Sequence, residues 1–408
     1  MLSRAKLDAA SREPRRQRAG AYTPYVQYNV PPARSAHRYA TSIRRVSGGD
    51  GSAAAAEREE RIGAVVGRLL FHTDYYAPIA REGAFRAVNA AAIPEFDSDA
   101  EDEAADGHAD TRDEDASADG YRAVKQLVAG THTLTRELEL RRARGAMGTA
   151  VKMVDAHLHV LSGLSAMQAG DAQVIHFDLK SDRLMYDAAR GLPKITGFGV
   201  AFRRSDVDPG DAASLRTYFY AYADEYAPWC IDVALLAYIA THALAPGENA
   251  RGVDDAISED DAQELRDVCR RFAQNNRMFA EGHYTPAQTE AFVAATETYA
   301  AGLRGQTWRA AATDLLDGWR TWDVYALCVI YRRALGSLFG DTFAESGATS
   351  PQKSSSFWVS GYVALLEGAL LAPPAAQGGA RRASPEEMAA AVSAGATSLA
   401  ASDAVLDR

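Results

Sequence analysis

One stretch of the sequence decides the expected fold: VIHFDLKSDRLMYDAARGLPKITGFGVAF, residues 174–202. Its short apolar runs, QVIHFDL, RLMYD and PKITGF, are separated by polar residues and glycine, a pattern typical of short strands joined by turns. The residues just before it, VDAHLHVLSGLSAMQAG, predict a helix that ends at Gly170, because a left-handed C-cap favours glycine. We therefore expect a helix, a polar loop around Asp178 and short strands on either side of that loop.

Upstream, the sequence predicts further strands and one long helix. AYTPYVQYNV and RYATSIRRV, residues 21–30 and 38–46, are rich in Tyr, Val, Ile and Thr, as strands are. AAAAEREERIGAVVGRLL consists of strong helix formers and places Ile62 and Val66 on one apolar face. YRAVKQLVAG, residues 121–130, predicts another strand.

Downstream of about residue 214 the pattern is helical. The predicted helices are IDVALLAYIATHAL, DAQELRDVCRRFAQ, PAQTEAFVAATETYAAGL, WDVYALCVIYRRALGSLF, SFWVSGYVALLEGALL and, near the end, PEEMAAAVSAGATSLAAS. A small strand-bearing N-terminal part followed by a mostly helical C-terminal part is an α+β, two-lobed arrangement.

Charge is distributed unevenly along the chain. Residues 1–46 carry ten Arg or Lys against two acids, and residues 95–119 carry twelve acids against one Arg. A basic arm of this kind can bind nucleic acid, an acidic membrane or an acidic protein, or it can be a solvated tail. We expect residues 1–20 to be flexible and residues 95–120 to form a disordered acidic insertion.

The cysteines and the apolar runs indicate the compartment. Cys230, Cys269 and Cys328 lie far apart in apolar helical contexts, so we expect buried thiols rather than disulfides or metal ligands. There is no uninterrupted apolar run long enough for a transmembrane helix, and the N-terminus is rich in Arg. The sequence therefore predicts an intracellular, cytoplasmic protein without a transmembrane segment.

HFDLKSDR resembles the protein-kinase catalytic loop H-R-D-L-x-x-x-N, and GFG stands where that family has D-F-G. The segment is most similar to serine/threonine kinases of large DNA viruses and some protists, and AVKQLVAGTHTL and TWDVYAL are similar too. The resemblance implies a protein kinase-like fold. Residues 21–130 would form a degenerate N-lobe that carries the acidic insertion, residues 131–372 a helical C-lobe, and residues 373–408 a C-terminal tail with a possible helix.

The resemblance also implies roles for single residues. Asp178 matches the catalytic base and Lys180 the lysine that contacts the transferred phosphate, while His176, Phe198 and Gly199 match structural positions. The backbone of this loop would be tied to an acid at the start of the large C-lobe helix, which we expect to be Asp232. Phe177 replaces the arginine that pairs with a phosphorylated activation loop in many kinases.

The positions that would bind Mg²⁺ and ATP depart from the family. Kinases hold Mg²⁺ with the Asp of D-F-G and the Asn of the catalytic loop, but here those positions are Gly197 and Arg183, which offer no side-chain oxygen. The N-lobe lysine position falls on Ser42, and Lys125 is an unlikely substitute. GAYTPYV has a single glycine where the phosphate-binding loop needs several.

Losses at several places that serve one reaction indicate a pseudokinase, which binds partners as a scaffold or as a structural component of a larger assembly. Its partners would be proteins, with acidic or nucleic-acid contacts through the basic arm, and the viral resemblance makes a virion location plausible. We expect no bound cofactor. The alternatives are an atypical active serine/threonine kinase that uses ATP and Mg²⁺, with Asp182 or Asp187 as metal ligands, and a nucleotide-binding switch without turnover.

Overall fold

The chain divides into two compact units. The structure is a computed structural model, and it describes residues 26–27, 39–46, 50–78, 86–88, 120–127, 132–143, 146–188, 190–247, 251–281, 284–344, 353–374 and 382–406. The first unit takes the described residues up to 64 and those between 78 and 128, and the second takes 65–77 and those from 129 onward. Residues 65–77 thus belong to the second unit, although in the chain they lie between the two segments of the first unit.

The first unit contains an antiparallel sheet. Its strands are β1 (Val26–Gln27), β2 (Tyr39–Val46), β3 (Arg86–Val88) and β4 (Gly120–Leu127), in the order β1-β2-β4-β3. The longest pairing joins β2 to β4, with Tyr39 opposite Leu127 and Val46 opposite Gly120. The strands predicted within 21–30, 38–46 and 121–130 are confirmed.

Helix α2 (Asp50–Val66) follows β2 in the chain. Its run of Ala, Glu and Arg favours the helix, because these residues have high helix propensity. Ile62 and Val66 are both fully buried, which confirms the apolar face predicted for this segment.

The strands of the second unit form two small sheets. In the first, β5 (His132–Thr133), β7 (Leu184–Asp187) and β8 (Leu192–Ile195) pair in the order β5-β7-β8. In the second, β6 (Val174–Ile175) pairs with β9 (Phe202–Arg203). The short strands predicted around the loop at Asp178 are thus present, and the antiparallel β7–β8 pair brings the residues that follow the loop next to the Gly-Phe-Gly triplet.

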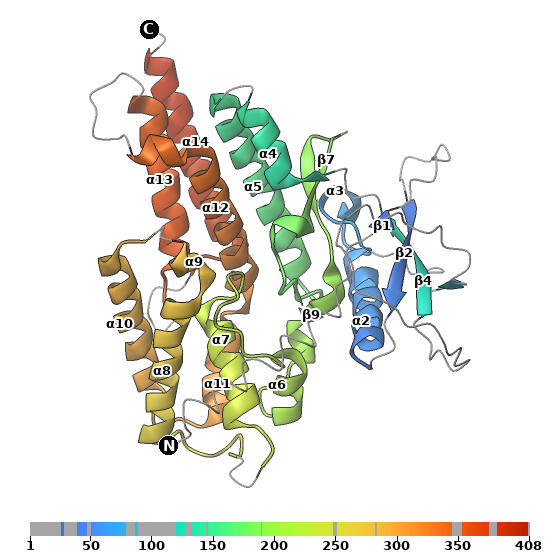
Figure 1. Cartoon of the computed structure of the whole chain (residues 1–408), viewed down its shortest axis with the longest axis vertical. Coiled ribbons are helices and arrows are strands. Elements are labelled where there is room, and N and C mark those ends of the chain that lie inside the picture. Colours follow the sequence, from blue (N-terminus) through green and yellow to red (C-terminus); the bar gives the residue numbers. More distant parts are fainter. Residues whose placement is uncertain are drawn as a thin grey trace, which may run out of the picture. The chain divides into compact units, whose positions relative to one another are not determined.

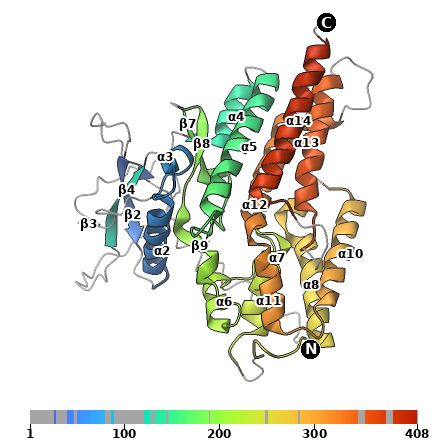
Figure 2. The same cartoon turned by 180° about the vertical axis from the view of Figure 1, so that it is seen from behind.

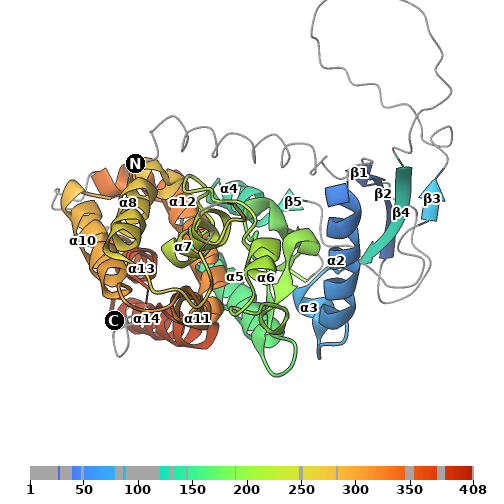
Figure 3. The same ribbon diagram turned by 90° about the horizontal axis from the view of Figure 1, so that it is seen from below.

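Most of the second unit is helical. Its α-helices are α3 (His72–Tyr75), α4 (Leu134–Arg142), α5 (Ala146–Gln168), α6 (Ala212–Tyr218), α7 (Ile231–Tyr238), α8 (Glu259–Asn275), α9 (Arg277–Ala280), α10 (Pro286–Gly302), α11 (Trp308–Asp317), α12 (Trp322–Ala344), α13 (Lys353–Leu370) and α14 (Pro385–Leu406). Helices α12 and α14 lie beside α5, and α13 packs against α12 and α14 (Figures 1 and 2). Helices α8 and α10 form a separate pair next to α7, seen from below in Figure 3.

Local sequence signals mark where several helices begin and end. Ser258 and Asp261 form a capping box at the start of α8, and Thr285 and Gln288 do the same for α10. Gly170 follows α5 with φ = 53°, the left-handed conformation that its position predicts. The helices expected from the apolar pattern are confirmed, whereas α3, α4, α6, α9 and α11 were not among the predicted helices.

The C-terminal helix is part of the second unit rather than a separate tail. Helix α14 packs against α5 and α13, and Ser165 Oγ donates a hydrogen bond of 2.6 Å to Glu386 Oε1. Met388 and Val392 are buried. The further helix expected within 373–408 is therefore confirmed, and it contributes to the core. The arm at 1–20 and the acidic insertion at 95–119 lie outside the described residues.

Two general predictions can be compared with the structure. All three cysteines, Cys230, Cys269 and Cys328, are buried and form no disulfide, as expected. Among the helices that the structure describes, none combines the length and the apolar character needed to cross a membrane.

Candidate functional site around Asp178

The loop that holds Asp178 is fixed by a carboxylate from a distant helix. Asp323, in the first turn of α12, accepts the backbone N–H groups of His176 at 2.8 Å and of Phe177 at 3.0 Å. Asp323 is 1% exposed, so these two hydrogen bonds are shielded from water. The sequence predicts this role for Asp232, and that prediction was wrong.

Phe177 has an unusual backbone conformation that its surroundings maintain. Its φ of 67° lies in the left-handed region, which is uncommon for a bulky residue. Its carbonyl oxygen accepts a 2.8 Å hydrogen bond from Trp229 Nε1, and its ring lies 4.9 Å from the Trp229 ring and 5.1 Å from that of Phe202, between centroids. Where many kinases have an arginine, this chain buries an aromatic ring.

Both oxygens of the Asp178 carboxylate are engaged within the protein. Oδ1 accepts a hydrogen bond from the Tyr226 hydroxyl, and Oδ2 accepts one from Arg183 Nη2 at 3.1 Å. Lys180 Nζ lies 3.8 Å from the same Oδ2 and 3.8 Å from Asp182 Oδ2. The two residues predicted as the base and the phosphate-contacting lysine therefore do lie together, but they face each other and Arg183.

Three neighbours favour the charged form of Asp178. Burial by itself would raise the pKa of this carboxyl group, but the charges of Arg183 and Lys180 and the Tyr226 hydrogen bond outweigh it, so the pKa lies below its ordinary value of 3.8. A general base works best when its pKa is near the working pH and when it can reach the proton that it removes. Asp178 has instead the properties of the acidic partner in a buried ion pair.

Arg183 fills the space beside Gly197. The Arg183 side chain is 5% exposed and lies directly against the glycine, where a Cβ atom would stand 2.6 Å from Arg183 Cδ. Gly197 has φ = 77°, a conformation that glycine adopts readily. The two positions that the kinase resemblance assigns to Mg²⁺ binding are thus in contact here, and they bring together a guanidinium group and a residue without a side chain.

The structural positions of the motif lie in the core. His176 is fully buried, and its Nε2 lies 2.8 Å from the carbonyl oxygen of Thr196, which requires the proton to be on that nitrogen. The Phe198 ring packs 5.1 Å from the His176 ring, between centroids. Gly199 is also buried, in the 3₁₀ turn η3 (Phe198–Val200). These contacts join the loop to the Gly-Phe-Gly triplet independently of any ligand.

Asp232 belongs to a second buried ion pair, away from the loop. It pairs with Arg382, which precedes α14, and both side chains are 3% exposed. Burial by itself would lower the pKa of Arg382, but the charge and the hydrogen bond of Asp232, together with the nearby Cys230 and Tyr325, outweigh burial and raise it. Arg382 also donates to the hydroxyl of Thr321 at 3.4 Å and to the carbonyl oxygen of Ala372 at 3.0 Å.

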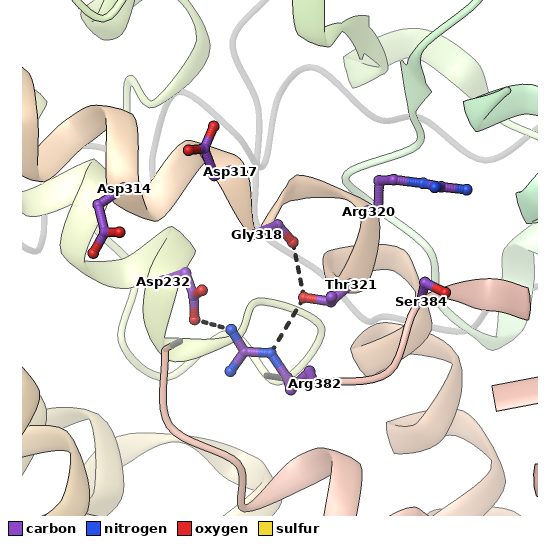
Figure 4. Close-up of a pocket in the computed structure, with 8 residues that line it drawn as sticks. All are labelled: Asp232, Asp314, Asp317, Gly318, Arg320, Thr321, Arg382 and Ser384. Carbon is purple, nitrogen blue, oxygen red and sulfur yellow. Dashed lines mark hydrogen bonds and ion pairs between the residues drawn. The ribbon is translucent and has the colours of Figure 1, made fainter. Parts of the chain in front are cut away.

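A cavity of about 160 Å³ borders this pair (Figure 4). Its wall combines acidic, basic and hydroxyl side chains: Asp232, Asp314, Asp317, Gly318, Arg320, Thr321, Arg382 and Ser384. Several of these groups already have partners, since Asp314 accepts from the Tyr299 hydroxyl at 2.8 Å and Arg320 pairs with Glu386 at 2.7 Å. The cavity is therefore polar, and most of the charged side chains in its wall already have an ion-pair or hydrogen-bond partner within the protein.

The predicted nucleotide-lysine positions lie in the first unit. Ser42 is on β2, opposite Val124 of β4, and Lys125 is on β4, opposite Thr41. Ser42 and Lys125 are therefore on neighbouring strands, one residue out of register. Lys125 lies within the strand predicted for this segment.

The alternative metal ligands also have partners. Asp187 Oδ2 lies 3.1 Å from Lys194 Nζ in a largely buried ion pair, and the more exposed Asp182 lies 3.8 Å from Arg183 Nη1. Among the residues that the structure describes, no group of three or more His, Cys, Asp or Glu side chains is arranged to hold a metal ion.

The sequence did not identify three residues of these networks: Tyr226, Asp323 and Arg382. The signal for Asp323 was present in TWDVYAL, which resembles the family, but that for Tyr226 was not, because the contact depends on how residues 204–226 return to the loop. Neither a protein-family model nor a curated protein sequence matches this chain.

Proposed function

We propose that this protein has a kinase-like fold that no longer transfers phosphate and that it acts by binding other proteins, as a scaffold or as a structural component of an assembly. The observation that carries the proposal is the ion pair between Arg183 and Asp178. It places a permanent cation where the resemblance calls for a metal-binding asparagine. A divalent cation near Arg183 would be repelled, and because the arginine side chain is only 5% exposed, solvent would screen that repulsion little.

The order of elements supports the kinase-like part of the proposal. In the first unit, two strands, a long helix and two further strands follow in chain order, and β2 pairs directly with β4. In the second unit, a long helix leads into the loop, which is followed by the β7–β8 pair and the Gly-Phe-Gly triplet. This is the order in which the resemblance places the lobes and their motifs.

The retained residues Asp178 and Lys180 have a structural role in this proposal. A buried arginine needs a counterion, and Asp178 supplies it. Asp178 also joins the loop to Tyr226, whose backbone carbonyl oxygen accepts a 3.3 Å hydrogen bond from Asn276 Nδ2. The motif is therefore bonded to the helical part of the second unit whether or not a nucleotide is present.

Binding would use the parts of the chain that do not serve catalysis. The basic segment at 1–46 suits an acidic protein or nucleic acid, and the acidic segment at 95–119 suits a basic partner. Three buried thiols suit a reducing, intracellular compartment, and the resemblance of the HFDLKSDR loop to that of viral kinases is the reason to propose a virion as the more specific location.

Equilibrium binding of ATP, measured with and without Mg²⁺, tests the proposal. We expect no binding that depends on Mg²⁺, either in the natural chain or in Lys180→Ala. Binding that is independent of the metal would favour a nucleotide switch without turnover. Mg²⁺-dependent binding, weakened by Lys180→Ala, would favour an active kinase and overturn the proposal.

A further inference from the structure

Arg183 and Gly197 fit each other closely, and the following inference rests on the proposed function. A Cβ atom at position 197 would lie 2.6 Å from Cδ, 2.9 Å from Nε and 3.2 Å from Cζ of Arg183. Real Cβ atoms essentially never approach other heavy atoms to less than 3.0 Å. Any side chain at 197 would therefore displace the arginine from its present position.

Arg183 cannot move aside without losing its ion pair. Its side chain is 5% exposed, and Nη2 is held at 3.1 Å from Asp178 Oδ2. Its backbone is held as well, because its carbonyl oxygen accepts from the Thr196 N–H at 2.9 Å, one residue before the glycine. The Arg183 backbone is thus hydrogen-bonded to the residue before Gly197, and its guanidinium group is paired with Asp178. Because the side chain is held at both ends, it can adopt few other conformations.

We propose that the Arg183 guanidinium occupies the place where the kinase resemblance puts a divalent metal ion, that it is the counterion of Asp178, and that the absence of a side chain at Gly197 makes room for it. The two departures from the kinase motif are then one interdependent unit. While Arg183 is seated, both its charge and its volume exclude a divalent cation. Replacing either residue alone disrupts the packing of Arg183 against Gly197. Replacing both frees the volume that the Arg183 side chain now fills.

A cycle of alanine variants tests the fit. Gly305 is a matched control, because its φ is 78° and a Cβ atom added there would have no other atom within 4 Å. We expect Gly305→Ala to lower the Tm by about 2–4 °C through backbone strain alone, and Gly197→Ala to lower it at least twice as much. In an Arg183→Ala background, Gly197→Ala should cost no more than Gly305→Ala does in the natural chain. If Gly197→Ala lowers the Tm equally in the natural chain and in the Arg183→Ala variant, the proposal is overturned.

All five tryptophans lie in the second unit, so their fluorescence follows the unfolding of the part that contains the site. If Gly197→Ala does not fold alone, its recovery by Arg183→Ala reports the same coupling. If Arg183→Ala is itself too unstable because Asp178 loses its counterion, the cycle is repeated with Asp178→Asn in every variant. If Arg183→Ala does not reduce the Tm loss that Gly197→Ala causes in this Asp178→Asn background, the proposal is likewise overturned.

A metal-binding measurement tests the replacement of the cation. The double variant Arg183→Asn with Gly197→Asp restores two oxygen ligands, and millimolar Mn²⁺ or Mg²⁺ alone should raise its Tm. The same ions should leave the Tm of the natural chain and of Gly197→Asp unchanged. A metal-dependent shift in the natural chain, or none in the double variant, would contradict the proposal. Neither experiment uses ATP, so phosphate transfer by the natural chain would refute the proposed function without deciding this coupling.

Discussion

Asp323 accepts the backbone N–H of His176 at 2.8 Å, although the two residues are 147 positions apart in the chain. Between them the chain forms the β7–β8 pair, β9 and helices α6 to α11 before α12 returns to the loop. The conformation of the loop therefore depends on a contact that closes only when most of the second unit has folded.

Replacement of Asp323 by Ala should destabilise the second unit strongly. It leaves the N–H groups of His176 and Phe177 buried without an acceptor, at a cost of roughly 2–5 kcal/mol in the free energy of unfolding. Urea denaturation followed by tryptophan fluorescence measures this loss. Asp317→Ala, at an exposed position on α11, should stay within about 0.5 kcal/mol of the natural chain. Similar values for the two variants would contradict the anchoring role.

Replacement of Asp178 by Ala should produce a loss of stability that depends on pH. Because the pKa of Asp178 is lower in the folded chain than its ordinary value of 3.8, its contribution is complete above that value and declines as the pH falls through the lower, folded-state pKa. At pH 7 the variant should be less stable by roughly 3–5 kcal/mol, because Arg183 is left buried and unpaired. The difference in Tm should narrow below about pH 4. Asp182→Ala, at the exposed neighbour, should show no such loss, and a deficit for Asp178→Ala that is unchanged down to pH 2 would refute this account.

The buried pair of Asp232 and Arg382 should behave as a coupled unit. Asp232→Asn and Arg382→Met should each cost roughly 3–5 kcal/mol, because each leaves a polar or charged partner in the interior. The double variant should cost less than the sum of the two single variants by more than about 1 kcal/mol. Arg320→Met, which breaks the exposed pair with Glu386, should cost less than about 1 kcal/mol. Additive losses at Asp232 and Arg382 would show that the pair is not coupled.

Replacement of Trp229 by Phe should test the hydrogen bond that holds the carbonyl of Phe177. The change keeps an aromatic ring but removes the donor at 2.8 Å. Trp308→Phe is a matched control, because Trp308 is also buried and its Nε1 has no hydrogen-bond partner among the described residues. Unfolding followed by circular dichroism should show a loss for Trp229→Phe that exceeds the control by about 1–2 kcal/mol. Equal losses would indicate that the ring contacts alone stabilise this conformation.

Local patterns in the sequence predict much of the fold. The apolar period over residues 53–70 and the glycine after α5 are signals that act within a few residues, and each marks an element or boundary that the structure contains. The strands next to the loop at Asp178 are short, but turns on both sides delimit them.

The choice of anchor for the loop shows where local patterns fail. Ile231 and Trp322 each open a helix with an apolar residue followed by Asp and Val, so Asp232 and Asp323 look alike in sequence. Which of them meets the loop depends on the path of the chain between the two helices. The sequence likewise identifies Arg183 and Gly197 as departures from the kinase motif, but their contact depends on the side-chain conformation of the arginine.

Transfer of the γ-phosphate of ATP is the most direct test of the central claim, that Arg183 has turned the loop at Asp178 from a catalytic into a structural element. The natural chain and Asp178→Ala are incubated with labelled ATP and Mg²⁺, with and without a general protein substrate. We predict no phosphate on the chain or on the substrate in either case. Mg²⁺-dependent transfer by the natural chain that disappears in a folded Asp178→Ala variant would contradict the account.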